Sequence, residues 1–257
     1  MSVPDRLDGL RVLLCDADGC LFPSETPAFD ASTDVTNRLL AELGIDRRFT
    51  AEELRGEALG KNFRATAADL AVAHGRALPA DELDRWVAEE MRAVSAHLAR
   101  VLAPDDAVRA PLTRLASRFE LSVVSSSALV RLDACFTATA LDELFPAACR
   151  YSAEDSLPTP TSKPDPAVYA FAGKQLGIAT TEGLAVEDST TGVRSAVAAG
   201  FPVVGNVQFV PVGERPARDT ALRGAGAFAV VEDWTELEAL VGRLTPPARA
   251  PETTQGV

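Results

Sequence analysis

The chain has 257 residues, of which 47% are hydrophobic and only 6% aromatic, so it contains enough apolar material for a full-sized core. This length suits one large domain, or one domain with a second inserted into it. The net charge of −12 argues against nucleic acid and anionic membranes as partners, because no basic patch stands out to offset it. A phosphorylated small molecule remains open as a partner, since a few cations and a metal ion can converge locally on an acidic protein.

The start of the chain and its cysteines favour a cytoplasmic protein. No apolar stretch is long enough to span a bilayer, and "MSVPDRLDGL" lacks the basic and then apolar profile of a signal peptide. The cysteines are irregularly spaced without a CxxC pair, so we expect reduced thiols that fill the core: Cys15, Cys20, Cys135 and Cys149. We expect a monomer or a homodimer.

Several short β-type runs alternate with helical patterns along the chain, and most of them are almost entirely apolar. They span residues 11–16, 120–126, 183–188, 201–206 and 227–233. Apolar strands separated by helices predict a parallel sheet covered on both faces, as in a Rossmann-like α/β core.

The stretch between the first two predicted strands, residues 30–103, has helical patterns without a convincing strand. One apolar stripe ends at Gly44, Thr50 and Glu53 form a predicted capping box, and a long amphipathic helix follows Pro79. We therefore predict an α/β core over 1–24 and 104–244 and an inserted all-helical cap over 25–103. The Pro-rich, polar tail 245–257 is predicted to be disordered.

The first predicted strand ends in "LLCDADGCLF", with two aspartates ahead of a glycine. Residues two apart in a strand point to the same side, so Asp16 and Asp18 can face one site if the extended backbone persists. The carboxyl ends of strands are where open α/β sheets bind ligands. Gly19 lets the chain turn away tightly. The alternative interpretation is an acidic surface turn.

A second acidic pair, Glu187 and Asp188, ends the run "GLAVED" and precedes a predicted helix. An acidic N-cap of that helix is the alternative. Two similar pairs show that such pairs are common. Glu154 and Asp155 follow "CRYSA", which we do not predict to be a strand. The other pair is Glu232 and Asp233, of which Asp233 is predicted to cap the last helix.

Hydroxyls and a lysine supply candidate phosphate ligands. Ser125 and Ser126 end the second predicted strand, 120–126, where a hydroxyl and backbone N–H groups can hold a phosphate oxygen. A serine N-cap of the next helix is the alternative. Lys163 precedes Pro164, which restricts it to an extended backbone and can aim its side chain. A solvated surface lysine is the alternative here.

In this order, strand-DxDG, helical insert, strand-S, loop-KP and strand-ED, the motifs resemble the haloacid dehalogenase superfamily. The resemblance is to its phosphatase and β-phosphoglucomutase-like branch, covers about residues 10–243, and matches the cap only in general pattern. It implies Asp16 as the nucleophile that forms an aspartyl-phosphate and Asp18 as the acid and base. It also implies Ser125, Ser126 and Lys163 as ligands of the phosphoryl group.

The same resemblance implies Mg²⁺ as the cofactor. Asp16, the main-chain carbonyl of Asp18, and Asp188 would hold it, with Glu187 bound directly or through water; oxygen ligands suit this hard cation. Within the cap, "LGKNFRATA" resembles a loop that faces the active site in relatives. This implies substrate contacts for Lys61, Asn62 and Arg64, although a loop with solvated charges is the alternative.

The aspartate at position 18 favours phosphate-ester chemistry, because the dehalogenases and phosphonoacetaldehyde-hydrolysing relatives do not keep one there. The sugar phosphomutases that resemble this branch carry a histidine in the segment leading into the cap. This chain has "FPSETPAFD" there, which contains no histidine. We therefore predict an Mg²⁺-dependent phosphatase of small organic phosphate monoesters, with sugar phosphates as candidates. A sugar phosphomutase and a non-catalytic binding protein on the same fold are the alternatives.

Overall fold

The computed structural model describes residues 7, 9–58 and 62–245. Apart from Thr245, the tail predicted to be disordered lies outside these residues, as does Lys61. No helix of the described residues combines the length and apolar character needed to cross a membrane.

The core is a six-stranded parallel sheet in the order β3-β2-β1-β4-β5-β6. The strands are β1 Val12–Cys15, β2 Glu120–Ser125, β3 Arg150–Ser152, β4 Gly183–Glu187, β5 Val203–Asn206 and β6 Ala229–Val231. The predicted Rossmann-like α/β class is confirmed. Because all strands run in one direction, their carboxyl ends meet at one edge of the sheet.

The edge strand β3 corrects our interpretation of "CRYSA", which we did not predict to be a strand. Its register pairs Tyr151 with Val124 of β2. Arg150 of this strand is buried. Its guanidinium can be buried because it donates to the carbonyl of Phe145 and to Asp133 and Asp142. An arginine buried by such tertiary partners interrupts the apolar pattern on which strand prediction depends.

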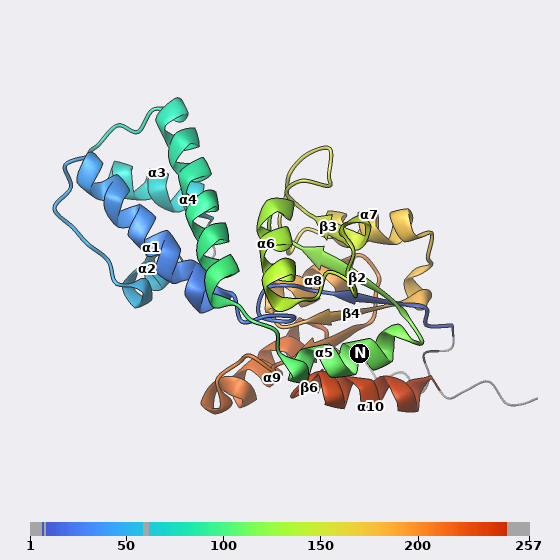
Figure 1. The fold of residues 1–257 in the computed structure, drawn as a ribbon. Coiled ribbons are helices and arrows are strands. Elements are labelled where there is room, and N and C mark those ends of the chain that lie inside the picture. Colours follow the sequence, from blue (N-terminus) through green and yellow to red (C-terminus); the bar gives the residue numbers. More distant parts are fainter. Residues whose placement is uncertain (1–6, 8, 59–61, 246–257) are drawn as a thin grey trace, which may run out of the picture.

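Helices cover both faces of the sheet (Figure 1). Leu13 and Cys15 of β1 belong to one apolar cluster, and Val12 and Leu14 belong to the other, as the alternation of a strand requires. Helices α5 Asp106–Ala116, α6 Leu129–Thr139 and α10 Trp234–Leu244 pack in the first cluster. Helices α7 Ala167–Leu176, α8 Thr190–Ala198 and α9 Arg215–Ala225 pack in the second. Short 3-10 turns are η1 Ala147–Cys149, η2 Thr180–Glu182 and η3 Val212–Glu214.

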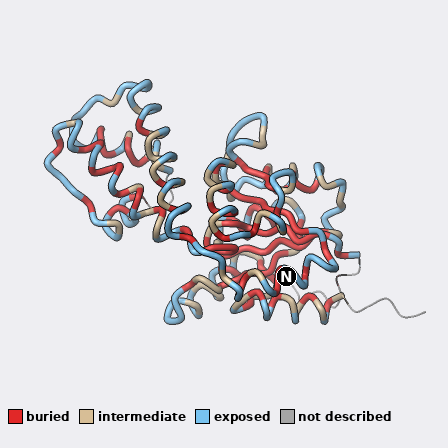
Figure 2. Tube along the Cα trace, viewed as in Figure 1, coloured by how far each residue is buried: buried red, intermediate tan, exposed pale blue. Residues whose placement is uncertain are grey.

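The cap consists of α1 Glu25–Glu42, α2 Ala51–Glu57, α3 Phe63–Ala73 and α4 Ala80–Val101. It stands to one side of the core in Figure 1 and has its own small apolar clusters, visible as buried segments in Figure 2. The predicted capping box is present: Thr50 Oγ1 accepts from the N–H of Glu53, and the Glu53 carboxylate accepts from the N–H of Thr50. This closure fixes where α2 begins.

Helices α1 and α4 pack along each other. The chain enters the cap at the start of α1 and returns to the core at the end of α4. The predicted boundary at residue 24 coincides with the start of α1, and the boundary at 103 falls between α4 and α5. Helix α4 also packs against α6 of the core (Figure 1). One face of the cap therefore lies beside the carboxyl edge of the sheet.

The cysteines are free thiols; Cys15, Cys20 and Cys135 are buried as predicted, whereas Cys149 is only partly buried and does not fill the core. Burial raises the pKa of Cys15 and Cys20, and the neighbouring carboxylate of Asp16 raises both further. These thiols stay protonated and serve as core side chains.

Candidate active site

Asp16 lies directly after β1 at the carboxyl edge of the sheet. Its N–H donates to the carbonyl of Val186 in β4, which extends the pairing of the two central strands by one residue. Its side chain is only 10% exposed, and the Nζ of Lys163 lies 2.5 Å from its Oδ1. Asp16 is therefore not part of an acidic surface turn.

Lys163 is held in the centre of the site. Its Nζ donates to Asp16 Oδ1, to Glu187 Oε1 at 2.6 Å, and to the carbonyl of Val124 at 2.7 Å. Burial lowers its pKa, but the carboxylates of Asp16 and Glu187 outweigh burial and raise the pKa above its ordinary value. This lysine is a buried, permanent cation and not a solvated surface charge.

The loop carrying Lys163 is tied to the end of β2. The backbone N–H of Lys163 donates to Ser126 Oγ at 3.0 Å, and the Ser125 hydroxyl accepts from the N–H of Ser127 at 3.0 Å. Helix α6 is not capped by these serines; instead Asp155 Oδ2 accepts from Leu129 N–H at 2.6 Å. The serine N-cap alternative is therefore wrong. Binding of phosphate by Ser125 and Ser126 stays a prediction.

Glu187, the last residue of β4, is fully buried. Its Oε1 accepts from the hydroxyl of Tyr169 at 2.5 Å as well as from Lys163, whereas its Oε2 is buried without a hydrogen-bond partner. Helix α8 approaches this oxygen so closely that a Cβ at Gly192 would lie 1.8 Å from it. A buried carboxylate oxygen without a donor indicates a missing partner such as a cation.

Asp188 completes the acidic cluster, and it does not cap α8, whose N-cap is Ser189. Ligand oxygens of Asp16, Glu187 and Asp188 lie within 4.8 Å of one another. Gly19, with φ +77°, passes beside this group, and a Cβ there would lie 2.4 Å from Asp188 Oδ2. The glycine is thus required both by its backbone conformation and by the space that the carboxylate occupies.

The electrostatics of this cluster fit a divalent cation. Burial, opposed by Lys163 but reinforced by Glu187, raises the pKa of Asp16 to about 7. Burial together with the charges of Asp16 and Glu187 raises the pKa of Asp188 well above its ordinary value. Three buried carboxylates with one ammonium group have excess negative charge, which a hard cation bound by oxygen ligands would neutralise.

Asp18 is directed differently from Asp16. Strand β1 ends at Cys15, so the alternation of a strand does not extend to Asp18. Its carboxylate accepts from Arg131 Nη2 at 2.8 Å, from Ser127 Oγ at 2.6 Å, and from the hydroxyl of Ser24. Burial raises its pKa, but Arg131 and the hydroxyls outweigh burial, and the pKa lies below its ordinary value. Asp18 is held as an anion beside α6.

The predicted cap residues make contacts within the cap. Asn62 caps α3, because its side-chain oxygen accepts from the N–H of Ala65 at 2.9 Å. Arg64 pairs with Asp84 of α4 at 2.6 Å, with both side chains exposed. Lys61 is outside the described residues. Their contact with a substrate stays a prediction.

Several site residues were not found by sequence reasoning: Ser24, Ser127, Arg131, Tyr169 and Arg218. Arg218 of α9 donates to the main-chain carbonyl of Asp188 at 2.8 Å. Tyr169 and Arg131 lie in the first turns of helices that follow recognised motifs, which was the available signal. Their partners lie far away in the sequence, so the motifs alone did not identify them.

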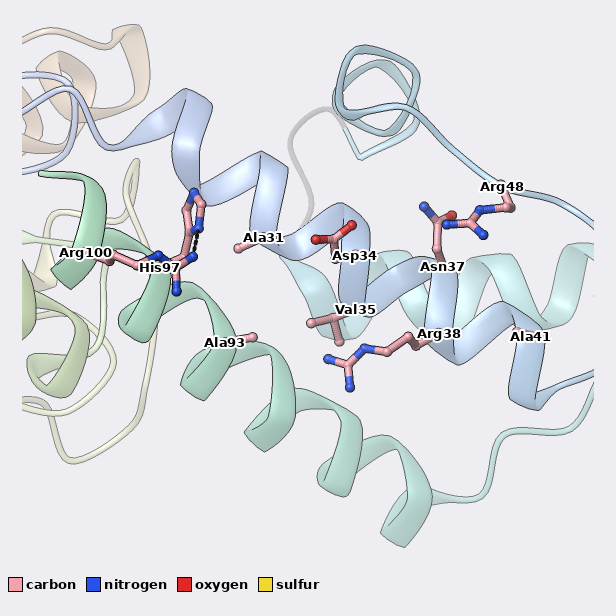
Figure 3. Close-up of a pocket in the computed structure, with 10 residues that line it drawn as sticks. All are labelled: Ala31, Asp34, Val35, Asn37, Arg38, Ala41, Arg48, Ala93, His97 and Arg100. Carbon is pink, nitrogen blue, oxygen red and sulfur yellow. Dashed lines mark hydrogen bonds between the residues drawn. The ribbon is translucent and has the colours of Figure 1, made fainter.

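Both histidines lie in the cap. His74 ends α3, with its Nδ1 2.9 Å from the carbonyl of Leu70. His97 of α4 accepts from Arg100 and lines a groove of about 490 Å³ between α1 and α4 (Figure 3). Neither residue belongs to the cluster around Asp16.

Comparison with known proteins agrees with this geometry. The model of the haloacid dehalogenase-like hydrolase family matches residues 14–206, and the chain belongs to this family. No curated protein matches the chain.

Solved structures of similar fold include bacterial relatives. A haloacid dehalogenase-like protein from Agrobacterium tumefaciens shares 27% identity and has a TM-score of 0.66, covering 91% of this chain and 98% of that one. A hydrolase of the family from Deinococcus radiodurans, with bound phosphate and sodium, shares 29% identity and has a TM-score of 0.64, covering 93% and 99%. CbbY from Rhodobacter sphaeroides, in complex with xylulose-(1,5)bisphosphate, shares 21% identity and has a TM-score of 0.66, covering 89% and 96%.

Proposed function

We propose that this protein is an Mg²⁺-dependent phosphatase that hydrolyses small organic phosphate monoesters through an aspartyl-phosphate intermediate. The observation that carries the proposal is the buried Asp16 carboxylate, held by Lys163 beside Glu187 and Asp188. Phosphate esters resist nucleophiles because of their own negative charge, so catalysis consists mainly of positioning and charge neutralisation. A buried ammonium group that touches the nucleophile supplies both.

In the first step, a carboxylate oxygen of Asp16 attacks phosphorus and the bond to the ester oxygen breaks. Asp18 donates a proton to the departing oxygen, so that an alcohol leaves. In the second step, Asp18 takes a proton from water, whose oxygen attacks the same phosphorus and releases inorganic phosphate and free Asp16. Lys163 stabilises charge on the phosphoryl oxygens in both steps.

Asp16, Glu187 and Asp188 would hold Mg²⁺, with the main-chain carbonyl of Asp18 as a further ligand. When bound, the metal supplies positive charge that offsets these carboxylates and the phosphoryl oxygens. The bond between Arg131 and Asp18 keeps Asp18 in the anionic form that accepts a proton. To act as the acid, the protonated Asp18 side chain has to release Arg131 and turn toward the ester oxygen.

Two properties of relatives and of this chain support hydrolysis over phosphomutase activity. The similar hydrolase from Deinococcus radiodurans binds phosphate. In this chain the segment leading into the cap has Ala28 and Phe29 but no histidine, and His74 and His97 have partners elsewhere in the cap. No cap histidine therefore stands beside Asp18 to hold a sugar hydroxyl.

A panel of phosphate esters assayed for inorganic phosphate tests the proposal, with Mg²⁺ and with a chelator. We expect release that requires Mg²⁺ and returns when the metal is restored. A hexose 1-phosphate supplied with a catalytic amount of bisphosphate distinguishes the mutase, which would form an isomer without free phosphate. Absence of turnover across the whole panel would instead favour a non-catalytic binding protein.

A further inference from the structure

Asp188 is fixed in the acidic cluster by a different partner from the other two acids. Asp16 and Glu187 are both bonded to Lys163, whose Nζ donates to each of them. Asp188 lies in the short connection between β4 and α8. Within the part of the chain that the structure describes, its one ion-pair partner is Arg218 of α9. The contact with Arg218 is therefore the polar contact that can hold Asp188 in place.

One nitrogen of Arg218 reaches both the main chain and the side chain of Asp188. Its Nη1 donates to the Asp188 carbonyl at 2.8 Å and lies 3.9 Å from Asp188 Oδ2. The Asp188 side chain is only 5% exposed, and a Cβ at Gly19 would lie 2.4 Å from the same Oδ2. The main chain and one carboxylate oxygen of Asp188 are therefore held from the side of α9, with Gly19 in close contact.

Arg218 reaches Asp188 from outside the segment that identifies the family. The family model matches residues 14–206, whereas α9 follows β5 and begins at Arg215. The helix packs against α8, β5 and β6, and the contact with Asp188 places its start beside the end of β4. The recognised motifs therefore do not include this partner of a candidate metal ligand.

A guanidinium beside a metal ligand has two opposite effects on metal binding. Its charge repels a divalent cation, whereas its hydrogen bond fixes the residue that binds the cation. The Arg218 side chain is 33% exposed, so water screens its charge. Hydrogen-bond partners of metal ligands typically contribute a factor of about 10–100 to metal affinity. We therefore expect the positioning effect to be the larger one.

We propose that Arg218 is a positioning residue that holds Asp188 in place for Mg²⁺ and thereby raises the preference of the site for Mg²⁺ over Ca²⁺. Mg²⁺ requires short bonds in a nearly ideal octahedron, whereas Ca²⁺ accepts longer bonds and flexible geometry. A loosened Asp188 should therefore weaken Mg²⁺ binding more than Ca²⁺ binding. The inference rests on the proposed function, because that function assigns the metal to Asp16, Glu187 and Asp188.

The test measures metal binding without substrate or turnover. The metal-free protein is titrated with Mg²⁺ and, separately, with Ca²⁺ in a calorimeter. We expect Arg218→Met to raise the Kd for Mg²⁺ by about tenfold and the Kd for Ca²⁺ by about threefold or less. The two ions carry the same charge, so loss of the Arg218 charge alone would change both Kd values by the same factor. A change in the ratio of the two values is therefore specific to positioning.

Arg215 of the same helix provides the matched control. It donates to the main-chain carbonyls of Val210 and Gln208 and pairs with Glu232. We expect Arg215→Met to lower the melting temperature and to leave both Kd values unchanged. Arg218→Lys keeps a cation with N–H donors and should retain most of the Mg²⁺ preference. Melting without metal checks folding, and Arg218→Gln replaces the methionine variant if that variant is unfolded.

The outcomes separate this inference from the proposed function. Equal changes in both Kd values on Arg218→Met, or no change, refute the positioning role and leave the phosphatase standing. Mg²⁺ binding with the expected ratios but no release of phosphate from any ester refutes the phosphatase alone. Failure of the unaltered protein to bind Mg²⁺ refutes the metal site, and the role of Arg218 with it.

Discussion

The core site and the cap use charged side chains in opposite ways. In the core, Lys163 is 5% exposed and bonded to two carboxylates, whereas in the cap Arg64 is 47% exposed and paired with one carboxylate that is more exposed still. Desolvated charges interact strongly, and surface pairs are screened by water. The core therefore holds the groups suited to chemistry, while surface ion pairs of the cap join its own helices to one another.

The largest effect is expected for the nucleophile. Asp16→Asn keeps the size of a buried side chain but removes the carboxylate, so we expect phosphate release to fall by about 10³-fold or more. The assay is steady-state release of inorganic phosphate from the best ester of the panel, with circular dichroism as the control for folding. Near-normal rates would remove Asp16 from the role of nucleophile.

A smaller but still large effect is expected for the central cation. Lys163→Met preserves much of the apolar stem and deletes the ammonium group that bonds Asp16 and Glu187. We expect kcat to fall by about 10²- to 10³-fold, comparable to the loss of a preorganised electrostatic group. A variant with a raised KM and an unchanged kcat would show that Lys163 contributes only to binding of the ground state.

The contrast between core and cap also explains what the sequence could predict. Parallel strands bring their carboxyl ends to one edge, so the acids after two apolar runs were predicted to lie together, and Asp16, Glu187 and Asp188 do so. The helical cap followed from 3.6-residue periodicity and from the capping box at Thr50. Both are regular features that local pattern encodes.

Tertiary partners account for what the sequence could not predict. Strand β3 was missed because Arg150 is buried by partners from another element and breaks the apolar run. The partners of Asp18 were not predicted because β1 ends before it and because Arg131, more than a hundred positions away, holds its carboxylate. A local pattern carries no information about such distant partners.

A moderate effect is expected for Tyr169, which positions Glu187 without touching the other acids. Tyr169→Phe removes one hydrogen bond to a buried carboxylate, worth about 1.5–3 kcal/mol. We expect activity to fall about tenfold, and the Mg²⁺ concentration needed for half-maximal activity to rise. A loss of activity at unchanged Mg²⁺ requirement would contradict a positioning role toward the metal ligands.

The raised pKa of Asp16, about 7, and of Asp188 predicts how pH affects the metal-free protein. The folded protein binds protons on these groups more tightly than the unfolded chain does, so their contribution to stability falls as pH rises from about 4 toward 7. Mg²⁺ offsets the repulsion between the deprotonated groups. The rise in melting temperature on adding Mg²⁺ should therefore be larger at pH 8 than at pH 5.5. An equal rise at both values would contradict the metal site, and Asp188→Asn should reduce the rise.

The smallest effect is expected in the cap, and it tests whether Arg64 contacts the substrate. Because its guanidinium is bound to Asp84 on the surface, Arg64→Ala should change stability by only about 0–1 kcal/mol and kcat/KM by less than about twofold. Asp84→Asn serves as the matched control, since it breaks the same pair and leaves the arginine in place. If Arg64→Ala lowers kcat/KM tenfold while Asp84→Asn does not, the arginine reaches the substrate during turnover. The cap would then contribute a cation to the active site, and the contrast between a chemical core and a self-supporting cap would no longer hold.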